Sequence, residues 1–157
     1  MRKLLASALS DKARDGLGAK MITKDARILL VDDLNLIRRM LRQCLDEMGF
    51  KYIEDATDGN EAIFKLSKAR SKGVPFDLLF LDWNMPNKTG IEVVEYCRAS
   101  ELFKDLPIIM VTAEAEKKNV LRALMNGAND YIVKPVSADI LRAKLDHINE
   151  QLKKKVG

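Results

Sequence analysis

Five polar side chains directly follow strand-like apolar runs in this sequence: Asp32, Asp33, Asp82, Thr112 and Lys134. Parallel strands that end in this way bring their last side chains to one edge of a sheet, so we expect all five to share a crevice. The set would combine three carboxylates, a hydroxyl and an ammonium group. Clustered carboxylates repel one another, and a hard divalent cation such as Mg²⁺ relieves that repulsion. The residues therefore predict a site for a divalent cation and a phosphoryl group.

Each charged group has a candidate role in such a site. Asp33 and Asp82 are candidates for direct contact with Mg²⁺, and Asp32 would act directly or through water. The backbone carbonyl of Asn84 is a further candidate ligand. A carboxylate can also attack as a nucleophile and form an acyl phosphate, while Lys134 supplies a point positive charge. Taken singly, an aspartate after a strand is often only a cap or turn residue.

The elements that must position these residues alternate between strand-like and helix-like periods. This alternation predicts an α/β fold with a parallel sheet. The expected strands are Ile28–Val31, Tyr52–Ala56, Phe76–Leu81, Ile108–Val111 and Tyr131–Val133. The second of these runs is acidic and is a candidate edge strand. A helix is expected after each strand, with candidate caps at Asn35, Thr89 and Ser137.

Length, composition and charge favour one soluble, cytoplasmic domain. The chain has 157 residues, 47% hydrophobic and 32% charged, and no apolar run approaches the roughly 18 residues that span a membrane. Residues 1–26 hold six basic and three acidic residues, or +3 of the net +4, which leaves +1 for residues 27–157. This near balance argues against nucleic acid as a partner. Cys44, Cys97 and His147 form no zinc motif, and we expect reduced thiols.

The chain divides into three parts by pattern. Residues 1–26 lack strand signals and are predicted to be a mobile N-terminal extension. Residues 27–153 are predicted to form the domain, and residues 154–157 a C-terminal tail. The first residues loosely imitate a signal peptide, but their apolar stretch is too short. The alternative for the extension is a helix that binds a partner or a membrane surface through Met1, Leu4, Leu5 and Ala8.

At the site positions the sequence resembles the receiver domains of two-component response regulators, in particular those of chemotaxis. The resemblance covers residues 27–153. It rests on Val31-Asp32-Asp33, Asp82-Trp83-Asn84-Met85-Pro86-Asn87, Met110-Val111-Thr112-Ala113-Glu114-Ala115, Gly127-Ala128 and Tyr131-Ile132-Val133-Lys134-Pro135. The family implies a doubly wound five-stranded parallel sheet, flavodoxin-like (β/α)5, with strand order 2-1-3-4-5. It also implies a cis peptide bond between Lys134 and Pro135.

The resemblance assigns the site residues. Asp82 is expected to be the phosphoacceptor and Lys134 the ammonium that pairs with the phosphoryl group. Asp32 and Asp33 are expected to be the acidic metal pair. Thr112 is expected to be the switch hydroxyl, which moves toward the phosphoryl group.

The resemblance also implies a switch and partner surface, made of Tyr131, Ala113, Glu114, Lys117 and Lys118. Tyr131 would be the switch aromatic, whose ring turns inward. From its strand position alone we would expect its hydroxyl in water.

Two positions depart from the family pattern. Lys88-Thr89 replaces the usual acidic residue before Gly90, and Leu34 stands where the chemotaxis proteins carry an aromatic residue. Both positions bear on the rates of the reactions at the site and on recognition by an accessory phosphatase.

The implied function is a single-domain, monomeric phosphorylation switch rather than an enzyme acting on other substrates. A histidine kinase would donate a phosphoryl group to Asp82 in a Mg²⁺-dependent step. The modified protein would bind a target, first of all a flagellar motor switch protein, and an accessory phosphatase is a further candidate partner. The alternative is a phosphorelay intermediate that passes the group to a histidine phosphotransfer protein.

Two other classes share part of the pattern. Haloacid-dehalogenase-type phosphatases also use a nucleophilic aspartate after a strand, but they carry a second aspartate where this chain has Asn84. Flavodoxin-like cofactor binding needs a hydroxyl-rich or glycine-rich phosphate cradle in the first loop. The first loop here, Asp32-Asp33-Leu34-Asn35, does not provide one.

Overall fold

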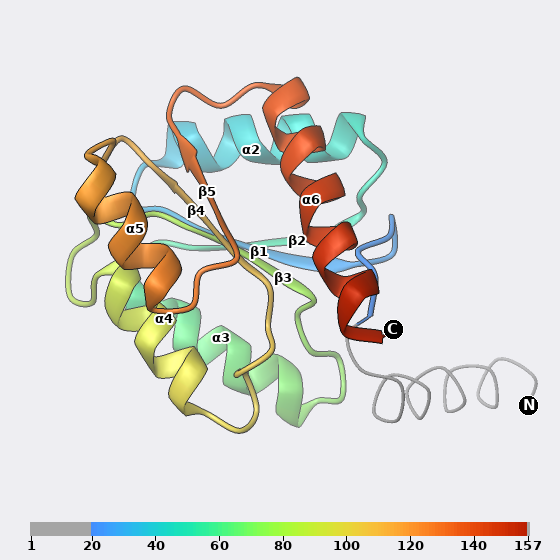
Figure 1. Ribbon diagram of the computed structural model, residues 1–157. Helices are drawn as coiled ribbons and strands as arrows, with labels where there is room; N and C mark the ends of the chain where they lie inside the picture. Colours follow the sequence, from blue (N-terminus) through green and yellow to red (C-terminus); the bar gives the residue numbers. More distant parts are fainter. Residues whose placement is uncertain (1–19, 157) are drawn as a thin grey trace, which may run out of the picture.

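The computed structural model describes residues 20–156, in which five parallel β-strands alternate with five α-helices (Figure 1). The strands are β1 (Arg27–Val31), β2 (Tyr52–Ala56), β3 (Leu78–Leu81), β4 (Ile108–Thr112) and β5 (Asp130–Val133). The helices are α2 (Asn35–Glu47), α3 (Gly59–Ser71), α4 (Gly90–Ala99), α5 (Lys117–Met125) and α6 (Ala138–Val156). The sheet order β2-β1-β3-β4-β5 confirms the flavodoxin-like fold, with the acidic β2 at an edge.

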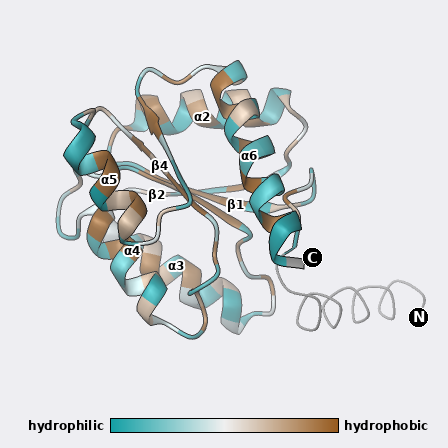
Figure 2. Cartoon of the chain, in the orientation of Figure 1, coloured by the Kyte–Doolittle hydropathy of each residue, from teal (hydrophilic) through white to brown (hydrophobic). Residues whose placement is uncertain are grey.

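Two helical layers cover the sheet, so its strands are apolar on both faces. Helices α2 and α6 lie on one face, and α3, α4 and α5 lie on the other (Figure 1). Alternate residues of β1 enter the two layers: Leu29 and Val31 pack with α3 and α4, while Ile28 and Leu30 pack with α2 and α6. Figure 2 shows the resulting hydrophobic centre and hydrophilic outer helix faces. This two-sided burial is why the strands read as continuous apolar runs.

The backbone ladder continues past the strand ends into the predicted site residues. The Asp82 N–H donates to the Val31 carbonyl at 2.9 Å, and the Lys134 N–H donates to the Thr112 carbonyl at 2.9 Å. The Asp32 N–H likewise donates to a carbonyl of β2 at 3.2 Å. Because these residues are fixed by sheet hydrogen bonds, their side chains start from rigid positions at one edge of the sheet.

The predicted helix caps have different outcomes. Thr89 accepts the Glu92 N–H at 3.4 Å, and Ser137 accepts the Ile140 N–H at 3.2 Å, as predicted. The prediction for Asn35 is wrong, because Asn35 is the first residue of α2 and Leu34 occupies the N-cap position without a side-chain cap bond.

Strand β3 begins at Leu78, two residues later than predicted. Its neighbour Asp77 bonds to Arg27 of β1 twice: the Asp77 carboxylate accepts the Arg27 N–H at 2.9 Å, and the Asp77 N–H donates to the Arg27 carbonyl at 2.8 Å.

Part of the predicted extension packs on the domain. Ile22 is buried, and its backbone pairs with the side-chain amide of Asn149 in α6 through bonds of 2.7 and 3.1 Å. Residues 1–19, with the apolar positions of the predicted extension helix, lie outside the described residues. No helix within residues 20–156 is long and apolar enough to cross a membrane. Cys44 and Cys97 are free thiols, and burial raises the pKa of the Cys97 thiol to about 11.

Contacts around the buried Asp130 tie β5 to α6. Asp130 lies 2.9 Å from the Lys144 ammonium and 2.6 Å from Nδ1 of His147, and it accepts the Tyr131 N–H at 2.8 Å. The His147 side chain is 55% exposed but makes this contact. Burial would raise the pKa of Asp130, yet the bonds from Lys144 and His147 outweigh it and hold the pKa below its ordinary value.

Asp130→Asn is expected to lower the free energy of unfolding near neutral pH by about 1–2 kcal/mol, since bonds to a charged group exceed neutral ones. The depressed pKa means that this stabilisation is present above the ordinary carboxyl pKa of 3.8 and is lost as the pH falls through the folded-state value. Urea unfolding of both proteins across the acid range measures the difference. Asp139→Asn, at an exposed pair with Arg142, is the control and should change little. Equal stability of Asp130→Asn and wild type at neutral pH would contradict this role.

Candidate functional site

Three carboxylates meet where β1 and β3 end. One oxygen from each of Asp32, Asp33 and Asp82 lies within 4.8 Å of the others. Asp32 and Asp82 are buried, at 1% and 5% exposure, whereas Asp33 is exposed. The cluster therefore has two members inside the protein and one at the opening to solvent, which leaves a path by which an ion can enter.

Lys134 joins this cluster from the end of β5. Its ammonium lies 2.9 Å from Asp32 and 3.5 Å from Asp82, and its side chain is 13% exposed. One ammonium offsets one of the three negative charges when all three groups are ionised. An excess of negative charge remains, which a divalent cation would neutralise.

The environment of Asp82 disfavours its charged form. Burial raises the pKa of this carboxyl, and the neighbouring Asp32 charge raises it further. Lys134, a hydrogen bond with Thr112 and the Trp83 N–H, 2.8 Å from Oδ1, act in the opposite direction but do not reverse the shift. Asp82 is thus a desolvated carboxylate with a cation beside it, which suits a nucleophile.

The loop after Asp82 needs a glycine at its end. Gly90 begins α4 and donates its N–H to the Trp83 carbonyl at 2.8 Å. A Cβ atom at this position would lie 2.1 Å from the backbone oxygen of Asp82. The close approach explains Gly90, and it places Lys88, one of the departures from the family pattern, in this same loop. Asn84 is exposed two residues after Asp82. Leu34, the other departure, is 54% exposed beside the acidic pair.

A chain of contacts links Thr112 to Tyr131. The buried Thr112 hydroxyl accepts the Glu114 N–H at 3.3 Å, and the Tyr131 hydroxyl donates to the Glu114 carbonyl at 2.8 Å. The Tyr131 ring is buried, and burial, followed by the Glu114 and Asp82 charges, raises its pKa to about 12. The hydroxyl expected in water from strand position alone is therefore bonded to protein.

The remaining predicted surface residues lie next to this chain of contacts. Ala113 is exposed directly after β4, and Lys117 and Lys118 are exposed in the first turn of α5. Lys118 pairs with Glu116 at 3.4 Å. The structure thus gathers the predicted surface around β4, α5 and β5.

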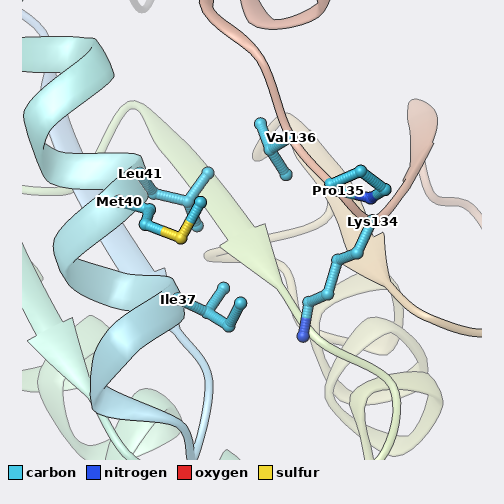
Figure 3. A pocket seen from close by; sticks show the side chains of 6 residues that line it. All are labelled: Ile37, Met40, Leu41, Lys134, Pro135 and Val136. Atoms are coloured by element: carbon cyan, nitrogen blue, oxygen red, sulfur yellow. The ribbon is translucent and has the colours of Figure 1, made fainter.

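An apolar pocket of about 250 Å³ adjoins Lys134 on its other side. Figure 3 shows side chains of α2 facing the segment that follows β5 across this pocket. Its lining consists of Ile37, Met40, Leu41, Lys134, Pro135 and Val136. The Lys134–Pro135 peptide bond is cis, as the resemblance implies.

Comparisons with known proteins identify the class of protein that has this flavodoxin-like sheet and acidic crevice. Residues 28–146 match the response regulator receiver domain family, so the chain belongs to that family. It is 40% identical over 132 residues to chemotaxis protein CheY-3 of Vibrio cholerae, covering 84% of this chain and 98% of that protein. It is also 40% identical over 126 residues to chemotaxis protein CheY of Pseudomonas aeruginosa, covering 80% and 98%.

Comparison with solved structures also finds chemotaxis response regulators. The chemotaxis response regulator CheY4 of Vibrio cholerae matches with a TM-score of 0.70 and 35% identity, over 79% of this chain and 98% of that one. CheY in the CheX–CheY–BeF3–Mg complex from Borrelia burgdorferi matches with a TM-score of 0.72 and 28% identity, over 78% and 88%. The protein is therefore a CheY-like receiver domain, a phosphorylation switch rather than an enzyme in the usual sense.

Two arginines that were not predicted from the sequence lie next to the site. Arg38 of α2 donates to the backbone carbonyl of Asp32 at 2.6 Å. Arg122 of α5 lies over the Trp83 ring at 5.8 Å. Basic residues are common on helix surfaces, so neither has a sequence signal that distinguishes it from its neighbours.

Asp82→Asn should make the metal-free protein more stable, because it removes one of three repelling carboxylates at a buried position. We expect its melting temperature in chelator to exceed that of wild type by about 2–8 °C. Saturating Mg²⁺ should reduce this difference in melting temperature, since a cation stabilises the wild-type cluster. Asp33→Asn is the control at the exposed member and should give a smaller rise. A wild type more stable than Asp82→Asn in chelator would contradict this account of the cluster.

Proposed function

We propose that this protein accepts a phosphoryl group from the phosphohistidine of a histidine kinase on Asp82. The observation that carries the proposal is the position of Asp82, buried beside a second carboxylate and 3.5 Å from the Lys134 ammonium. A lone carboxylate after a strand would serve equally well as a turn residue. A carboxylate desolvated next to both charges is suited to attack and to the stabilisation of phosphoryl oxygens.

The transfer needs few protein groups. An Asp82 carboxylate oxygen forms a bond to phosphorus, the bond between phosphorus and the histidine nitrogen breaks, and that nitrogen keeps the electron pair. Lys134 would pair with the phosphoryl oxygens, and the Thr112 hydroxyl would donate to one of them. Phosphoryl transfer depends on such positioning and charge stabilisation more than on acid–base chemistry.

The donor set fits Mg²⁺. Asp32, Asp33 and Asp82 provide hard oxygen ligands within 4.8 Å of one another, and Asp33 opens to solvent, so retained waters have room. The backbone carbonyl of Asn84 would be a further ligand. When bound, the ion would supply charge that stabilises the phosphoryl oxygens and offsets carboxylate repulsion. A relative supports this choice, since Borrelia burgdorferi CheY was solved in a complex with BeF3 and Mg.

Phosphorylation would act on partners through the contacts between Thr112, Glu114 and Tyr131. If Thr112 moves toward the phosphoryl group, it releases the Glu114 N–H, and the Tyr131 hydroxyl shares Glu114 as its partner. The surface with Ala113, Lys117 and Lys118 would then change its affinity for a target. The chemotaxis relatives support a flagellar motor switch protein as that target, and the CheX complex of a relative supports an accessory phosphatase.

Wild type should be labelled by a phosphohistidine donor or a small phosphodonor in the presence of Mg²⁺, and Asp82→Asn should not be labelled, because an amide cannot act as the nucleophile. Removal of Mg²⁺ with a chelator should reduce labelling of wild type strongly. Acid precipitation of the labelled protein, or mass spectrometry, measures the yield of labelling. Asp33→Ala should resemble the chelated wild type. Normal labelling of Asp82→Asn would disprove the acceptor assignment.

The phosphoryl group should be lost within seconds to minutes in the isolated protein with Mg²⁺. The side chains of Asn84 and Glu114 lie two residues beyond Asp82 and Thr112, where they would affect access of the attacking water. Decay of label after removal of the donor measures the lifetime. A lifetime of hours would count against the chemotaxis switch and would favour the phosphorelay intermediate.

A further inference from the structure

The peptide that joins Asp32 to Asp33 is held by a side chain from α2. The Arg38 guanidinium places Nη1 at 2.6 Å from the Asp32 carbonyl oxygen and Nε at 3.2 Å from an Asp55 carboxylate oxygen. Its third nitrogen lies 3.3 Å from Oδ1 of Asn35. The side chain is 11% exposed, so the guanidinium is both enclosed and bonded through all three nitrogens.

Asp55 is itself anchored, which makes it a firm support for Arg38. It lies in the edge strand β2, and its other carboxylate oxygen pairs with the Arg42 guanidinium. Arg42 also donates to the Ile53 carbonyl at 3.0 Å, and the Lys65 ammonium from α3 contacts the Asp55 carbonyl. Arg42 of α2 thus fixes the Asp55 carboxylate and Lys65 of α3 fixes the Asp55 backbone, and both contacts support the Arg38 fork.

The two acidic residues differ in how they are positioned. The Asp32 carboxylate is held by its own bonds, to the Leu34 N–H at 2.9 Å and to Lys134 at 2.9 Å. Within residues 20–156, the exposed Asp33 carboxylate takes part in no hydrogen bond or ion pair. Its direction therefore depends on the backbone that carries it, and the Asp32 carbonyl belongs to the peptide that leads into Asp33.

We propose that Arg38 is a positioning residue for the metal-binding carboxylates: it fixes the Asp32–Asp33 peptide and so aims Asp33 into the site before an ion binds. The inference rests on the proposed Mg²⁺ site and adds the group that preorganises it. Arg38 does not touch the carboxylates that would bind the ion. Its effect passes through the backbone, and its role is comparable to that of the outer-shell groups that orient metal ligands in other proteins.

The charge of Arg38 and its positioning role predict opposite effects of substitution on Mg²⁺ affinity, which makes the inference testable. A guanidinium near the site repels a cation, and its ion pair with Asp55 offsets that repulsion. If charge alone mattered, Arg38→Gln would tighten Mg²⁺ binding and Arg38→Lys would leave it unchanged. If positioning matters, both variants weaken binding, because neither amide nor ammonium can hold the Asp32 carbonyl and the Asp55 carboxylate in the same fork.

The experiment is a Mg²⁺ titration of the full chain, followed through Trp83, the single tryptophan, and by calorimetry. We expect the dissociation constant to rise by about tenfold in Arg38→Gln and in Arg38→Lys, the usual scale for loss of a ligand-orienting group. Thermal unfolding in chelator measures stability separately. Labelling of Asp82 at saturating Mg²⁺ should return close to the wild-type yield, since the residues at the acceptor are intact.

Arg39→Gln is the matched control. It removes the same charge from the next position of the same helix, and the Arg39 side chain is exposed and makes no hydrogen bond or ion pair within residues 20–156. We expect its Mg²⁺ affinity to stay within about twofold of wild type, because an exposed charge contributes little. Unchanged or tighter binding in the Arg38 variants overturns the inference, and so does equal weakening in Arg39→Gln. A wild type without a Mg²⁺ response, or a response unchanged in Asp33→Ala, would instead overturn the metal site itself.

Discussion

Repulsion among three carboxylates at one edge of the sheet is the constraint on which the rest of this structure depends. Asp32 and Asp82 are buried within 4.8 Å of each other and of Asp33, a costly arrangement for ionised groups. Lys134 offsets part of the charge, and its cation lies between Asp32 and Asp82. The remaining excess of negative charge favours binding of a divalent cation. It disfavours ionisation of all three carboxylates when no cation is bound. Burial, followed by the neighbouring Asp32 charge, raises the pKa of Asp82.

Such a site exists because the sheet around it is rigid. Ladder bonds continue into Asp32, Asp82 and Lys134, and two helical layers bury the strands on both faces. Gly90 allows the loop after Asp82 to return against its own backbone. The stability of the apolar core thus holds together charges that would otherwise separate.

Hydrogen bonds connect the acidic cluster to the predicted partner surface beside α5. Thr112 bonds to Asp82 and also accepts the Glu114 N–H, and the Glu114 carbonyl in turn accepts the Tyr131 hydroxyl. Two hydrogen bonds therefore connect Asp82 to Glu114, which lies shortly before α5. In the proposed switch, a change in the charge on Asp82 would act along these bonds.

The sequence by itself determined the fold class, the five strand–helix units and the grouping of Asp32, Asp33, Asp82, Thr112 and Lys134, because apolar runs that end in polar residues have few other arrangements. It could not place the N-cap of α2, where Asp32 takes the Leu34 N–H and Asn35 becomes helical. Nor could it show that Arg38 supports the acidic pair, that Asp130 binds α6, or that the Tyr131 hydroxyl lies against Glu114. Local pattern records which face a residue occupies. Which partner a polar group meets is decided by packing between segments far apart in the chain, and only the tertiary structure contains that packing.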